Sequence, residues 1–174
     1  APHEFNETRL ERLRNRFNKP AILLSEWTGE IKRAKLPNGQ IPERLKQVSG
    51  IIIDSFGKLS SLYRYADVAY IGGGFGAGIH NLNEAAVYGI PVIFGPNHSK
   101  FKEASDLIRC GGGFSIASRD EFNGVISSLA TSASRLHQAG DAAGRYIQDH
   151  LGATDLIYKD LFGDKSSQGE DGSL

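Results

Sequence analysis

The chain has 174 residues, of which 40% are hydrophobic and 23% charged, the composition of an ordinary globular domain that can bury a core. Its 20 Lys and Arg balance its 20 Asp and Glu, which argues against a protein that mainly neutralises nucleic-acid phosphates or coats an anionic membrane. A single cysteine excludes a disulfide framework and a multi-cysteine zinc site. No apolar run approaches the ~20 residues that span a bilayer, and the N-terminus lacks the pattern of a secretory signal. These properties predict a soluble, cytoplasmic domain.

The first expected element is a helix from Asn6 to Lys19, capped by Asn6 and stopped by Pro20. One face of this helix is rich in arginine: Arg9, Arg12, Arg14 and Arg16. This face is either a patch that binds an anion or, as is more common for such a run, simply a solvated surface.

A strand is expected over residues 21–27, followed by a surface excursion over residues 29–49. From there, short apolar runs alternate with helical patterns. Strands are predicted at 51–53, 68–71, 91–94 and 114–116, and helices at 59–66, 82–88, 101–109, 121–136 and 141–162. Nearly all-apolar strands that alternate with helices predict an α/β fold, with a parallel sheet covered by helices on both faces.

We expect one domain over residues 1–162 and a disordered tail over residues 163–174, which has almost no apolar content. A doubly wound domain normally begins with a strand. This chain begins with a helix, so its first β-α-β elements are expected to be absent.

Ligands of open α/β sheets bind at the carboxyl ends of the strands, and two such ends stand out. Residues 55–58 (Ser-Phe-Gly-Lys) follow one strand, and residues 72–84 (GGGFGAGIHNLNE) follow the next. Glycines allow backbone N–H groups to approach a phosphate, and the helix that starts near Asn81 directs its positive end to the same place.

The glycine-rich segment of residues 72–84 does not match the common glycine motifs well. The P-loop pattern and the G-x-S-x-G nucleophile elbow are both absent from the sequence. Gly72, Gly74 and Ala77 match a loose dinucleotide fingerprint, but the next strand ends at residues 94–96 (Phe-Gly-Pro), without the acidic residue that holds a ribose. Cys110 lies at the end of a predicted helix, before three glycines, and a structural role is expected for it.

Two interpretations of Glu84 remain open. Asn81 and Glu84 have the spacing of a capping box, which needs no ligand. Alternatively, Glu84 accepts hydrogen bonds from the two hydroxyls of a nucleotide ribose, with Asn81 near the phosphate. His80 could donate to an anion, although a lone histidine is more often structural.

Short motifs follow one another in a characteristic order: Gly72-Gly73-Gly74, His80-Asn81, Glu84, Phe94-Gly95-Pro96 and Lys100-Phe101-Lys102-Glu103. This order resembles the C-terminal half of Kdo transferases, the 3-deoxy-D-manno-octulosonic acid transferases of Gram-negative lipopolysaccharide synthesis. Upstream, residues 54–59 (DSFGKL) resemble the family's Asp-Thr-Met-Gly-Glu-Leu, and residues 1–4 (APHE) its Ala-Pro-Arg-His. The chain departs from the family pattern at His3, Lys58 and Ile79.

The resemblance implies a Rossmann-like domain, the donor-binding C-terminal half of a GT-B glycosyltransferase, without its first β-α-β elements. It implies CMP-Kdo as the donor substrate, a lipid A precursor as acceptor, inversion at the anomeric carbon, and no metal or other cofactor. No nucleic acid is expected as a partner. The full-length protein would lie at the cytoplasmic face of the inner membrane. This chain is expected to be soluble and to contact the membrane only as part of the full-length protein.

The family's donor-nucleotide contacts map onto twelve residues: Pro2, His3, Phe56, Gly57, Lys58, Gly73, Gly74, His80, Asn81, Leu82, Asn83 and Glu84. No catalytic residue is expected in the chain, because the family's general base lies in the N-terminal domain, so the isolated chain would be inactive. Two other classes remain open: another sugar-nucleotide GT-B enzyme, such as a UDP-dependent hexosyltransferase or an epimerase, and a non-catalytic nucleotide-binding module.

Overall fold

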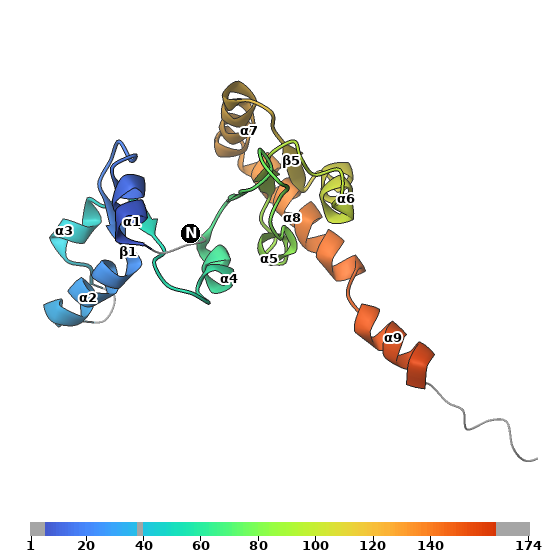
Figure 1. Cartoon of the computed structure of the whole chain (residues 1–174), viewed down its shortest axis with the longest axis horizontal. Helices are drawn as coiled ribbons and strands as arrows, with labels where there is room; N and C mark the ends of the chain where they lie inside the picture. The colour runs from blue at the N-terminus through green and yellow to red at the C-terminus, as the bar shows by residue number, and fades with distance from the viewer. Residues whose placement is uncertain (1–5, 38–39, 163–174) are drawn as a thin grey trace, which may run out of the picture. The chain divides into compact units, whose positions relative to one another are not determined.

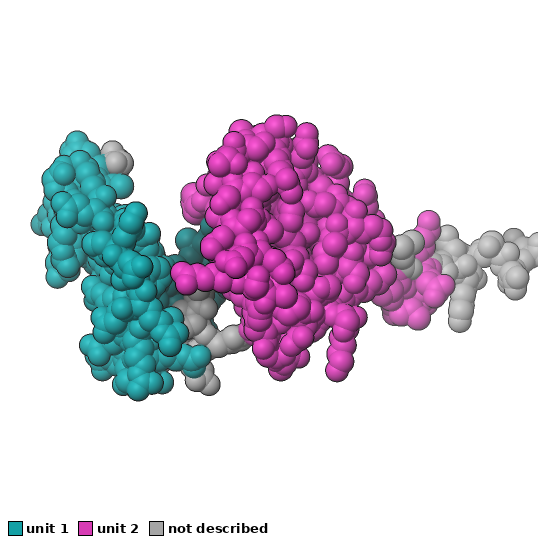
Figure 2. Space-filling model, turned by 90° about the horizontal axis from the view of Figure 1, so that it is seen from above, with its two compact units in different colours: residues 1–62 teal, residues 63–174 magenta. Residues whose placement is uncertain are grey.

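The computed structural model describes residues 6–37 and 40–162. Two compact units make up the chain, residues 1–62 and residues 63–174, coloured separately in Figure 2. The single domain expected over residues 1–162 stays a prediction. The predicted disorder of the tail concerns residues outside the described part.

Within its described residues, the first unit holds two parallel strands and four helices (Figure 1): α1 (Glu7–Arg14), β1 (Ala21–Leu23), α2 (Leu24–Ala34), α3 (Glu43–Lys46), β2 (Gly50–Ile52) and α4 (Leu59–Leu62). As predicted, Asn6 caps the first helix, and its side chain accepts a hydrogen bond from the Arg9 N–H at 2.8 Å. The strands pair in parallel, with Ala21 opposite Gly50.

The strand predicted over residues 21–27 is wrong beyond Leu23, where α2 begins. The Ser25 N–H, in the first turn of α2, donates to the Asp54 carboxylate at 3.1 Å, and the Leu23 N–H donates to Glu26 at 3.4 Å. These carboxylates satisfy N–H groups that a helix start leaves without partners. The predicted surface excursion over residues 29–49 likewise contains the rest of α2 and all of α3.

The second unit contains the other elements of the chain: η1 (Tyr63–Tyr65), β3 (Ala69–Ile71), α5 (Asn83–Ala86), β4 (Val92–Phe94), α6 (Lys102–Cys110), β5 (Gly113–Ser115), α7 (Arg119–Thr131), α8 (Ala133–Asp149) and α9 (Ala153–Phe162). Its three strands form a parallel sheet in the order β3-β4-β5. The predicted α/β fold with parallel strands flanked by helices is confirmed.

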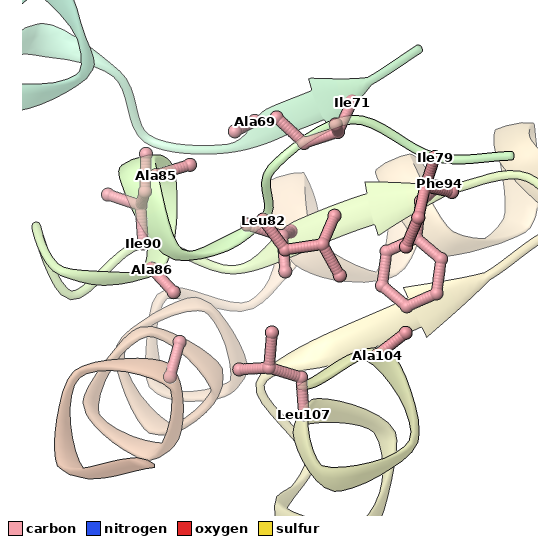
Figure 3. Packing of buried hydrophobic residues seen from close by; sticks show 12 residues of the cluster. Ala69, Ile71, Ile79, Leu82, Ala85, Ala86, Ile90, Phe94, Ala104 and Leu107 are labelled. Atoms are coloured by element: carbon pink, nitrogen blue, oxygen red, sulfur yellow. The ribbon is translucent and has the colours of Figure 1, made fainter. Parts of the chain in front are cut away.

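Alternation along the central strand β4 divides the core between the two faces of this sheet. Val92 and Phe94 lie in one buried cluster, which Leu107 of α6 and Ala143 of α8 complete. Figure 3 shows Phe94, Leu82, Ala104 and Leu107 directed toward one another in this cluster. Ile93 instead faces a second cluster, which includes Leu129 of α7. Burial of one such side chain stabilises the fold by about 1.5–3 kcal/mol, so helices on both faces hold the strand ends in place.

The helices predicted at 121–136 and 141–162 have different boundaries in the structure. One break falls at Ser132, which ends α7 and caps α8 by accepting a hydrogen bond from the Arg135 N–H at 3.2 Å. A second break separates α8 from α9 at residues 150–152, where Gly152 has a φ of 93° that other residues rarely adopt.

Candidate functional site

The glycine-rich loop after β3 folds back on itself. Gly76 N–H donates to the Gly73 carbonyl at 2.8 Å, and His80 N–H donates to the Gly72 carbonyl at 3.2 Å. Gly73 has a φ of 92°, and a Cβ added there would lie only 2.2 Å from the Gly78 carbonyl oxygen. A side chain at residue 73 would therefore prevent this closure.

The end of β4 braces the same loop. A Cβ on Gly74 would lie 2.7 Å from the Cα of Gly95, so the two backbones are in direct contact. Asn97 then donates twice to the loop at 2.9 Å, from its N–H to the Gly74 carbonyl and from Nδ2 to the Gly76 carbonyl. The glycines at residues 73 and 74 are thus required by packing within the loop, whether or not a ligand approaches it.

Asn97 is absent from the residues singled out from sequence. A partial signal was available, because it directly follows the Phe-Gly-Pro motif of residues 94–96. An asparagine after a strand end is typical of turns. Its hydrogen bonds to the glycine loop, however, depend on the pairing of β3 with β4, which cannot be read from the sequence around Asn97.

Asn81 connects the loop to Glu84. Its Oδ1 accepts a hydrogen bond from the Asn83 N–H at 3.0 Å, a local asparagine turn, while its Nδ2 donates to Glu84 Oε1 at 3.2 Å. Leu82, rather than Asn81, occupies the N-cap position of α5. The observed pattern differs from a capping box, in which the two residues exchange backbone N–H bonds. Asn81 instead orients an exposed Glu84 carboxylate.

The Glu84 charge also acts on Tyr63, a half-buried residue of η1. Burial raises the pKa of the Tyr63 phenol, and the nearby Glu84 carboxylate raises it further. Tyr63 therefore keeps its proton at neutral pH. Leu82 is fully buried in the core (Figure 3), so only its backbone could take part in binding.

In the first unit, the predicted site residues follow β2. Phe56 is 79% exposed. Gly57 has a φ of 71°, and a Cβ added to it would meet open space, so its backbone conformation alone favours glycine. Lys58 is exposed. Asp54, two residues before Phe56, accepts hydrogen bonds from both the N–H and the Oγ of Ser25.

The structure therefore brings together one group of the twelve predicted residues, which lies in the second unit: Gly73, Gly74, His80, Asn81, Leu82, Asn83 and Glu84. A second group, Phe56, Gly57 and Lys58, lies in the first unit. Pro2 and His3 lie outside the described residues.

An apolar cavity of about 450 Å³ adjoins the glycine loop through Phe75. Tyr70 and Phe122 form part of its wall and meet edge to face, with ring centroids 5.9 Å apart. Such a surface suits contact with a ring but offers little charge stabilisation to a phosphate.

The described residues hold neither a metal centre nor a membrane-spanning helix. They contain no group of three or more His, Cys, Asp or Glu side chains placed to hold a metal ion. In the same ranges, no helix has the length and apolar character needed to cross a bilayer.

Comparisons with known proteins complete the description of the site. No protein-family model matches the chain. It is 38% identical over 81 residues to the 3-deoxy-D-manno-octulosonic acid transferase of Aquifex aeolicus, covering 45% of this chain and 23% of that protein. It is 36% identical over 104 residues to the enzyme of the same name from Bordetella pertussis, covering 58% and 24%. The chain thus spans about a quarter of the length of these curated relatives.

Among solved structures, the chain is similar to the C-terminal CMP-Kdo binding domain of WaaA from Acinetobacter baumannii. The TM-score is 0.54 at 15% identity, over 81% of this chain and 95% of that one. The parallel strands flanked by helices match the fold of that domain, the C-terminal domain of a GT-B glycosyltransferase. The sequence relatives confirm the predicted resemblance: over these stretches the chain is similar to 3-deoxy-D-manno-octulosonic acid transferases, the Kdo transferases.

Proposed function

We propose that the chain is the donor-binding domain of a Kdo transferase and that its donor is CMP-Kdo. The main support is the site in the second unit, where a braced glycine loop leads directly to Asn81 and a carboxylate, Glu84, that Asn81 orients. The motifs of this site are those that the sequence shares with the family. The curated relatives and the similar solved domain agree with this proposal.

In this proposal, the second unit binds the nucleotide of the donor. Backbone N–H groups of the glycine loop lie near the phosphate, and Glu84 accepts hydrogen bonds from the two ribose hydroxyls. A carboxylate suits this task because it can accept hydrogen bonds from two donors at once. Hydrogen bonds to a charged acceptor are also stronger than those between neutral groups. The donor contacts predicted for residues 56–58 and for Pro2 and His3 stay predictions that go with this assignment.

The reaction proposed for the full-length protein is transfer of Kdo to a lipid A precursor at the cytoplasmic face of the inner membrane. A sugar hydroxyl of the acceptor attacks the anomeric carbon of Kdo with inversion. The bond from that carbon to the phosphate oxygen breaks, and CMP leaves with the electron pair. The acceptor proton passes to a base outside this chain. Donors fixed around the phosphate stabilise the charge that develops on the leaving group.

Isothermal titration of the chain with CMP, UMP and AMP tests the donor assignment. We expect CMP to bind most tightly, because the proposed donor carries cytidine. Equal affinity for the three nucleotides would contradict a cytidine donor, and tighter binding of UMP would favour a UDP-dependent enzyme. A variant with a bulky loop residue, Gly73→Val, serves as a control that should lose binding of all three.

A further inference from the structure

The chain has no net charge, but its two units carry opposite net charges. Residues 1–62 contain 11 Lys and Arg against 7 Asp and Glu, a net charge of +4. Residues 63–174 contain 9 against 13, a net charge of −4. The net charge of +4 on the first unit therefore suits an anionic partner.

Helix α1 concentrates the positive charge of this unit on one side. Arg9, Arg12 and Arg16 line a groove of about 290 Å³ together with Leu13. Their spacing of three and four residues places them on one side of the helix, continued into the turn that follows it. Glu7 and Glu11 fall on the opposite side by the same helical geometry. The groove lining in the described structure therefore includes three arginines and no carboxylate.

The remaining arginine of this segment has a different role. Arg14 forms an ion pair with Glu26 of α2 at 3.2 Å and does not line the groove. Arg12 and Arg16 are exposed, and neither has an ion pair with any residue that the structure describes. Like charges on one helix face repel one another, and an anion bound between them would remove that repulsion.

We propose that this groove is a binding site for a phosphate-bearing ligand, separate from the glycine loop. A guanidinium group donates two parallel hydrogen bonds to an oxyanion and keeps its charge at any physiological pH. A carboxylate has two oxygens in one plane and pairs with one guanidinium group. The oxygens of a phosphate point in several directions and can accept hydrogen bonds from two or three guanidinium groups. Arg12 and Arg16, both exposed and both lining this groove, therefore match phosphate better than carboxylate. Phosphate esters in solution and phospholipid headgroups present the same chemistry.

The test uses the full chain and two probes. Pyrophosphate is titrated by calorimetry, and vesicles of phosphatidylglycerol are tested by co-sedimentation against vesicles of phosphatidylcholine. The variant Arg12→Gln/Arg16→Gln removes two charges from the groove. The control variant Lys32→Gln/Arg33→Gln removes the same charge from α2 of the same unit. Thermal melts of all three proteins establish that the variants are folded.

We expect the groove variant to bind at least one probe about tenfold more weakly or worse, because each lost guanidinium removes charge-assisted bonds, while the control stays close to the wild type. Loss of pyrophosphate binding alone would identify a soluble phosphate ligand, and loss of binding to phosphatidylglycerol a headgroup. Equal binding by the two variants would overturn the proposal, since it would place any anion at another site such as the glycine loop. Failure of the wild type to bind either probe would overturn it too.

Discussion

Gly74 and Gly95 place the backbones of two neighbouring strand ends in direct contact. A Cβ added to Gly95 would lie 2.5 Å from the carbonyl carbon of Gly74, and one added to Gly74 would lie 2.7 Å from the backbone nitrogen of Gly95. The nearest obstructing atoms belong to the backbone, so movement of a side chain alone could not make room. This contact fixes where the glycine loop begins and therefore where its N–H groups lie.

Gly74→Ala should accordingly destabilise the second unit by about 1–3 kcal/mol, the usual cost of forcing an extra methyl group into a packed site. Urea unfolding measures this change. Gly124→Ala is the matched control, because Gly124 lies inside α7 with no atom near an added Cβ. There, alanine should stabilise the helix by roughly 0.5–1 kcal/mol. Equal stability of the two variants would show that the strand ends separate easily.

Glu84→Gln tests recognition at the other end of the loop. The amide keeps the shape of the side chain and can still contact Asn81, but it accepts hydrogen bonds from ribose hydroxyls less well. We expect the binding free energy of CMP to weaken by about 1–3 kcal/mol, the range for hydrogen bonds to charged groups, with little change in melting temperature. A drop in melting temperature with unchanged CMP affinity would instead assign Glu84 a structural role.

Much of the fold follows from the sequence because its signals are local. The apolar runs of residues 68–71 and 91–94 predict β3 and β4, and their glycine-rich continuations predict the strand end where the candidate site lies. The end of β1 at Leu23 was not predictable in the same way. It depends on Asp54, 29 residues later, accepting hydrogen bonds from Ser25, and nothing near Ser25 in sequence indicates that partner.

The candidate site shows the same limit. Its residues could be predicted from motif order, but the reason for its glycines could not. Phosphate approach and backbone contact both require glycine, and only the structure shows that Gly74 faces Gly95. The side-chain hydrogen bond from Asn81 to Glu84 could not be predicted from the sequence either, because the same three-residue spacing also fits a capping box.

Tyr63 provides a pH test of the site. Burial and the Glu84 carboxylate raise the pKa of its phenol in the folded state. The unfolded chain therefore loses this proton first, near pH 10, and the contribution of Tyr63 to stability decreases as the pH rises from there through the folded pKa. Unfolding free energies measured between pH 8 and 11 should, by the same linkage, decline less steeply in Tyr63→Phe than in the wild type.

Glu84→Gln checks the cause of this shift. Removing the carboxylate should lower the pKa of Tyr63, which ultraviolet titration of the wild type, Glu84→Gln and Tyr63→Phe can resolve as a difference. The direction of the change is fixed by electrostatics, since a nearby negative charge disfavours the phenolate. An unchanged titration would mean that burial alone raises the pKa.

The last prediction concerns catalysis. Transfer of Kdo needs a base within hydrogen-bond reach of the acceptor hydroxyl. Of the carboxylates near the predicted donor contacts, Glu84 is proposed to hold the ribose, and Asp54 already accepts two hydrogen bonds from Ser25. We therefore expect residues 1–174 alone to transfer no Kdo from CMP-Kdo to a lipid A precursor, while still binding CMP.

A chain extended to the length of the curated relatives should transfer Kdo, and radiolabelled product from both proteins can be compared directly. The variant Asp54→Asn, made in both proteins, separates two explanations of any activity. If Asp54 only holds Ser25 at the start of α2, the asparagine keeps part of that contact, and the loss of turnover should accompany a loss of stability. Turnover by residues 1–174 alone that disappears in Asp54→Asn, with the melting temperature unchanged, would show instead that the base lies in this chain.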